Sequence, residues 1–197
     1  FGVLRLLLDK IDIEKGIISI NGQEYKLNDT NFPTLNLKNP YKLTSEEEEV
    51  IERLKTSFMQ SEKLNKHVNF LYAKGHMYKK FNQNILFHGC IPMKENGEFD
   101  SVEILGKPLK GKDLLDCIET VAHKAYFGDK TEENQDAIDL MWYLWCGPKS
   151  PLFGKDKAAT FERYFLNDKS IHKENKNPYF TLINDEKICN KILENFD

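Results

Sequence analysis

The residue best suited to chemistry in this chain of 197 residues is His88. The mostly apolar residues 85–88 predict a buried strand that ends in this histidine, and Gly89 and Pro92 then turn the chain. An imidazole at a sheet edge, beside a glycine that permits close backbone approach, is a common arrangement for a metal ligand. A hydrogen-bonded core histidine would give the same pattern, so both interpretations stay open. The sequence holds no second obvious set of ligands to complete a metal site.

A loop over residues 146–156 supplies a second group of candidates, Lys149, Ser150 and Lys155. The loop follows a helix end rich in aromatic residues, and its prolines and glycines predict turns. Its lysines and backbone N–H groups could hold a phosphate, although an ordinary helix-to-helix connection with solvated lysines is the simpler interpretation. Arg163, which lies between aromatic residues, could bind a phosphate or carboxylate in a forked geometry, or pair structurally with a neighbouring acid.

Composition limits the classes of partner. The net charge is −3, the pI is about 6.0 and 30% of residues are charged, with no basic stripe that would suggest a nucleic-acid partner. No apolar run approaches the roughly 18 residues that a membrane span needs. The four cysteines are widely spaced among apolar neighbours, which indicates free thiols in a reducing cytoplasm.

Periodicity and turn residues predict a mixed α and β chain. Residues 17–20 and 23–27 flank an Asn-Gly pair typical of a type I′ hairpin. Thr44 and Glu47 form a capping box that opens a helix running to Gly75. Residues 77–81 and 85–88 predict two strands, and residues 102–105 and 107–109 a second small hairpin. Further helices are expected over 112–127, 132–145, 157–166 and 185–196, the last capped by Asn184. No feature marks a domain boundary within 1–197.

Four segments then resemble one family when taken together. They are residues 84–92 (NILFHGCIP), 142–147 (WYLWCG), 150–154 (SPLFG) and 160–165 (TFERYF). In combination they resemble the bacterial class III fructose-1,6-bisphosphatases, and the likeness covers essentially the whole chain. The resemblance implies hydrolysis of fructose-1,6-bisphosphate to fructose 6-phosphate and phosphate in gluconeogenesis, by a cytoplasmic enzyme that uses manganese. It leaves a homo-oligomeric state of the intact enzyme open.

That family is similar to the calcineurin-like metallophosphoesterases, which hold two metal ions through several short motifs. Only the strand-end His-Gly motif is present here, as His88 and Gly89. Because the other motifs are missing and the chain begins at Phe1, we expect an internal fragment of a metallophosphoesterase-type sandwich that is inactive alone. The resemblance implies two-metal catalysis in the intact enzyme, with His88 as a ligand of a dinuclear Mn²⁺ site.

The resemblance does not transfer roles to the basic residues one by one. Lys149, Ser150, Lys155 and Arg163 are therefore candidates for holding the phosphates of a sugar bisphosphate. Two other functions stay open at this point. One is a different metallophosphoesterase, and the other is a non-catalytic folded module in which His88 is only structural.

Overall fold

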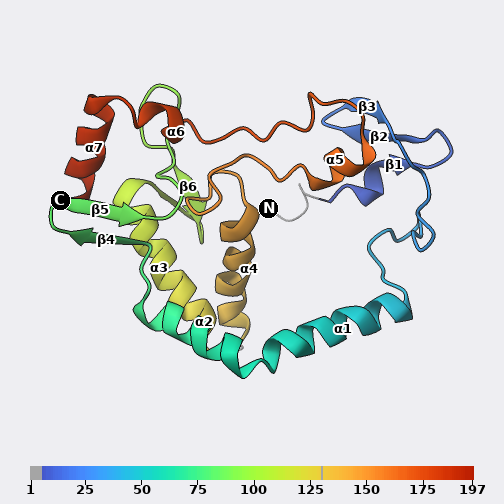
Figure 1. Cartoon of the computed structure of the whole chain (residues 1–197), viewed down its shortest axis with the longest axis horizontal. Coiled ribbons are helices and arrows are strands. Elements are labelled where there is room, and N and C mark those ends of the chain that lie inside the picture. The colour runs from blue at the N-terminus through green and yellow to red at the C-terminus, as the bar shows by residue number, and fades with distance from the viewer. Residues whose placement is uncertain (1–5, 130) are drawn as a thin grey trace. The chain divides into compact units, whose positions relative to one another are not determined.

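The computed structural model describes residues 6–129 and 131–197, without the side chains at positions 132 and 133. Groups of short antiparallel strands and groups of helices follow one another along it, which confirms the mixed α and β class (Figure 1). The chain divides into two compact units. The first takes in the described residues up to Asn69 and Ala159–Lys173, and the second consists of Phe70–Ala158 and Glu174–Asp197.

The first unit is organised by a small antiparallel sheet in the order β1 (Ile11–Asp12), β2 (Ile17–Ile20), β3 (Gln23–Lys26), which follows the 3-10 turn η2 (Leu8–Lys10). The predicted hairpin is confirmed, because Asn21 and Gly22 both have positive φ and Ile20 pairs with Gln23. Helix α5 (Thr160–Phe165), shorter than expected, joins this sheet: Asn28 N donates to Phe165 O at 2.8 Å.

Helices α1 (Ser45–Met59) and α2 (Glu62–Lys74) replace the single long helix predicted here. The capping box is confirmed, since Thr44 Oγ1 accepts from Glu47 N and Thr44 N donates to the Glu47 carboxylate. The prediction of one continuous helix was wrong. Ser61 interrupts it because its hydroxyl accepts a hydrogen bond from Leu64 N at 3.3 Å, which starts a new helix.

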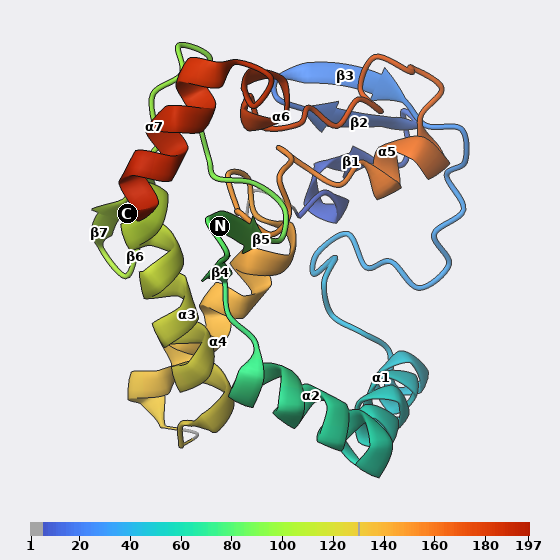
Figure 2. The same ribbon diagram turned by 60° about the vertical axis from the view of Figure 1, so that its left-hand side comes forward.

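The second unit is built on α3 (Gly111–Phe127) and α4 (Glu132–Cys146), which pack side by side (Figure 2). The apolar face predicted for α3 is confirmed: Leu114 and Ile118 are fully buried, and they share a core with Leu144 of α4. The predicted hairpin β6 (Val102–Ile104) and β7 (Lys107–Leu109) adds Val102 and Ile104 to the same core.

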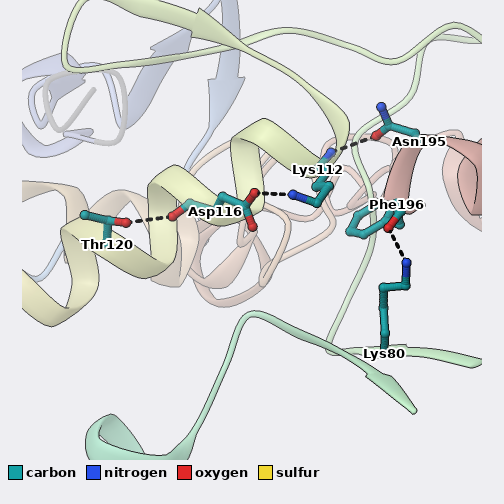
Figure 3. Close-up of polar contacts among 6 residues, drawn as sticks. All are labelled: Lys80, Lys112, Asp116, Thr120, Asn195 and Phe196. Carbon is teal, nitrogen blue, oxygen red and sulfur yellow. Dashed lines mark hydrogen bonds and ion pairs between the residues drawn. The ribbon is translucent and has the colours of Figure 1, made fainter. Parts of the chain in front are cut away.

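Helix α7 (Glu186–Phe196) closes this unit through hydrogen bonds at its end (Figure 3). Lys112 N, at the start of α3, donates to Asn195 Oδ1 at 2.8 Å, and Lys80 Nζ donates to Phe196 O at 2.8 Å. The cap predicted at Asn184 was wrong, because Asp185 accepts from Lys187 N instead. A short helix, α6 (Tyr179–Leu182), was not predicted, since four residues carry too little periodicity.

Strands β4 (Tyr78–Phe81) and β5 (Asn84–Phe87) form a two-stranded hairpin around a turn at Asn82 and Gln83, as expected. The prediction that β5 is buried was wrong, since Leu86 is 57% exposed. Ile85 and Phe87 pack against a core cluster, whereas the face that carries Leu86 has no covering layer within the described chain. No described helix combines the length and the apolar character that crossing a membrane would require.

The core between α3 and α4 gives a stability prediction. Leu114→Ala should lower the free energy of unfolding by about 2–5 kcal/mol, because it leaves a cavity among fully buried neighbours. Leu193→Ala on α7, where the side chain is 42% exposed, should change it by no more than about 0.5 kcal/mol. Urea unfolding of the two variants measures both effects, and equal losses would contradict the assigned core.

Candidate functional site

His88 lies immediately after β5, and its side chain is exposed. The interpretation as a core histidine therefore does not fit this structure. The next residue, Gly89, has φ +81°, and a Cβ there would stand 2.1 Å from Pro151 O. Cys90 N then donates to Pro151 O at 2.8 Å. Only glycine permits this approach, so the end of β5 is fixed against the loop that follows α4.

Ser150 organises that loop from the inside. It is fully buried, and its hydroxyl donates to Leu144 O at 2.6 Å and accepts from Leu152 N and Phe153 N at 3.2 and 3.3 Å. These bonds satisfy the donor and both acceptor positions of the hydroxyl. The structure thus gives Ser150 a role in holding the loop, while contact with substrate stays a prediction.

A cavity of about 370 Å³ brings His88 and Lys155 together. Trp145 also lines it, and the rest of the lining is apolar, from α4 and residues 152–153. Lys155 Nζ pairs with Glu174 Oε2 at 2.9 Å and lies 5.9 Å from the centre of the Phe153 ring. The cavity therefore combines one imidazole and one paired ammonium group within mostly apolar walls, and its volume suits a small molecule.

The remaining two candidates, Lys149 and Arg163, do not line the cavity. Lys149, which has φ +63°, pairs with Asp100 Oδ2 at 2.8 Å across the second unit. Arg163 belongs to α5 of the first unit, where it is exposed and its N–H donates to Ala159 O. The structure thus brings His88, Ser150 and Lys155 into one neighbourhood and describes Arg163 with the other unit.

Cys90, two residues beyond His88, is not a reactive nucleophile. It is fully buried, and burial raises the pKa of its thiol to about 12. Tyr143, in the last turn of α4, donates its hydroxyl to Pro148 O at 2.7 Å, and burial raises its pKa to about 12 as well. Both groups stay protonated near neutral pH, so the accessible chemistry here belongs to the His88 imidazole.

One imidazole does not make a metal centre. Among the described side chains, those of residues 6–129, 131 and 134–197, no three His, Cys, Asp or Glu groups gather in a way that could hold a metal ion. The residues present therefore do not fit a complete dinuclear site. The sequence did not identify Trp145 as a residue that lines the cavity. The available signal was its spacing from Trp142, which puts both tryptophans on one face of α4.

Comparison with known proteins assigns the chain to one family. The sequence model described as Firmicute fructose-1,6-bisphosphatase matches residues 3–197, and the chain belongs to that family. The resemblance predicted from its motifs is thereby confirmed.

Two curated relatives illustrate the match. The class 3 fructose-1,6-bisphosphatase of Clostridium botulinum (strain Kyoto / Type A2) is 54% identical over 194 residues, or 98% of this chain. That of Clostridium tetani (strain Massachusetts / E88) is 54% identical over 192 residues, or 97% of this chain. In both cases the chain spans only 29% of the relative's length. No solved structure gave a significant match.

The contact at Gly89 can be tested against a glycine of similar φ. Gly106 in the same unit has φ +77° and open space around its Cβ position. Gly106→Ala should cost about 1–2 kcal/mol from backbone strain alone. Gly89→Ala should cost about 1–3 kcal/mol more, because the new methyl group overlaps Pro151 O. Urea unfolding of both variants measures the difference, and similar losses would show that the close approach does not form.

The raised pKa of Cys90 predicts both reactivity and pH dependence. Iodoacetamide at pH 8 should leave Cys90 unmodified in the folded chain and alkylate it after unfolding, as read by mass spectrometry.

The pKa of the Cys90 thiol is about 12 in the folded chain and 9.0 for a free thiol, so the unfolded state loses the thiol proton at lower pH. The stability contributed by Cys90 is complete below pH 9 and falls as the pH rises toward 12. Cys90→Ala should flatten that part of the profile.

Proposed function

We propose that the full-length polypeptide containing this chain hydrolyses fructose-1,6-bisphosphate to fructose 6-phosphate and phosphate, as a step of gluconeogenesis. The observation that carries the proposal is the 54% identity, over 98% of the chain, to relatives named as class 3 fructose-1,6-bisphosphatases. A cytoplasmic location goes with this proposal, and the four free cysteines are compatible with a reducing compartment.

His88 is the residue proposed to bind metal. Its support is its exposure at the end of β5 and its place on the wall of the cavity. As a ligand it would bind through a neutral imidazole nitrogen, with the other ring nitrogen donating to an oxygen. The other ligands of a dinuclear manganese site would have to come from parts of the full-length polypeptide outside this chain.

Lys155 is the favoured candidate for contacting a substrate phosphate, because it shares the cavity with His88. Its ammonium group now faces Glu174, so binding a phosphate would require it to share or exchange that partner. Lys149 would likewise have to release Asp100. Arg163 and Ser150 remain candidates with weaker support, because one belongs to the first unit and the hydroxyl of the other is already fully used.

The metal proposal is tested in the full-length polypeptide loaded with manganese. His88→Ala should reduce metal affinity by at least about 10–100-fold. Removal of only the hydrogen-bonding partner of a metal ligand typically causes a loss of that size, and here the ligand itself is removed. Phosphate release from fructose-1,6-bisphosphate should fall with it. His67→Ala, an exposed histidine on α2, is the matched control and should change neither. Unchanged metal content in His88→Ala would favour a structural His88, and a preference for another phosphate ester would favour a different metallophosphoesterase.

The 197-residue chain alone should release no phosphate above background from fructose-1,6-bisphosphate with added manganese. The reason is that one imidazole cannot hold two metal ions, and no described group of three ligands exists. The same assay on the full-length polypeptide is the positive control. Robust turnover by the chain alone would overturn this division of the site.

A further inference from the structure

Helix α4 has three faces of different character. Ala137, Leu140 and Leu144 are buried in the core of the second unit. Gln135 and Asp139 form a polar flank, joined by a hydrogen bond of 2.7 Å from Gln135 Nε2 to Asp139 Oδ1. Between the two lies an apolar stripe, defined here as Ile138, Trp142 and Trp145, at the i, i+4, i+7 spacing of one helix face.

The stripe is exposed in this chain. The exposed fractions of Ile138, Trp142 and Trp145 are 37%, 50% and 69%. The two tryptophans are the only ones in the sequence, and their rings meet edge to face at 5.2 Å. A tryptophan can bury about 150–250 Å², so leaving both in water forgoes a large hydrophobic contribution. Aromatic residues with such exposure are typical of the centres of protein interfaces.

The apolar stripe ends at the cavity that His88 lines. Trp145, at its C-terminal end, lines the same cavity as His88 and Lys155. Whatever covers Trp145 therefore also comes close to the imidazole. A covering surface at this place would close the open side of the cavity and exclude water from it.

We propose that the apolar stripe of α4 is the docking surface for the remainder of the family's polypeptide. This chain spans only 29% of the relatives' length, so most of the family's polypeptide is available as an occupant. The inference rests on the proposed function in one respect: His88 needs further metal ligands. The described side chains of this chain hold no group of three ligands, and the rest of the polypeptide is the occupant that can bring different ones to His88.

The test is oxidative footprinting of Trp142 and Trp145, read by mass spectrometry, in the full-length polypeptide and in the 197-residue chain. Protection of Cys90 from alkylation checks that the chain is folded. Both tryptophans should react about fivefold more slowly in the full-length polypeptide, because a half-exposed side chain becomes part of an interface core. In denaturant the two proteins should react at equal rates.

Two variants of the full-length polypeptide sharpen the result. Trp145→Glu should raise the reactivity of Trp142 to its level in the isolated chain, whereas Gln135→Glu, on the polar flank of the same helix, should leave it low. Equal native rates in both proteins would overturn the docking proposal even if fructose-1,6-bisphosphate is hydrolysed. Protection that fades on dilution together with a doubled mass would assign the surface to a second copy instead. Protection without hydrolysis would uphold the docking surface and reject the proposed function.

Discussion

The close approach of Gly89 to Pro151 is the contact on which the candidate site depends. It joins the end of β5 to the loop after α4, two segments about 60 residues apart in the sequence. The hydrogen bond from Cys90 N to Pro151 O secures the junction, and the hydroxyl of Ser150 holds the loop in the shape that presents this carbonyl. That contact places His88 on the wall of the same cavity as Lys155 and Trp145.

The candidate site therefore consists of a buried support and an exposed surface on which the described residues do not form a complete metal site. Its support is buried and satisfied: Cys90 and Ser150 are fully enclosed, and their polar atoms serve the backbone or stay protonated. Its surface carries one exposed imidazole, one paired ammonium group and two exposed tryptophans. This division is physically consistent with a part whose partner surface lies in the rest of a longer polypeptide.

Local signals predicted much of the fold because short-range chemistry decides it. The Asn-Gly turn, the capping box at Thr44 and the apolar periodicity of α3 each depend on residues within one or two turns of the chain. The failures arose where local signals competed or where distant packing decided. Ser61 broke a helix whose apolar spacing continued through it. The face of β5 that carries Leu86 stayed exposed, because no element of the described chain packs over it.

By itself, the sequence determined the family and the mixed α and β class, and it singled out His88 as the candidate histidine. These results depend on residue types, order and spacing. Tertiary structure alone decided which candidates meet. The buried hydroxyl of Ser150 stabilises the loop, and Lys155 lines the same cavity as His88. Arg163 belongs to the other unit. The physical reason is that these outcomes depend on long-range contacts, above all a backbone approach that only Gly89 allows.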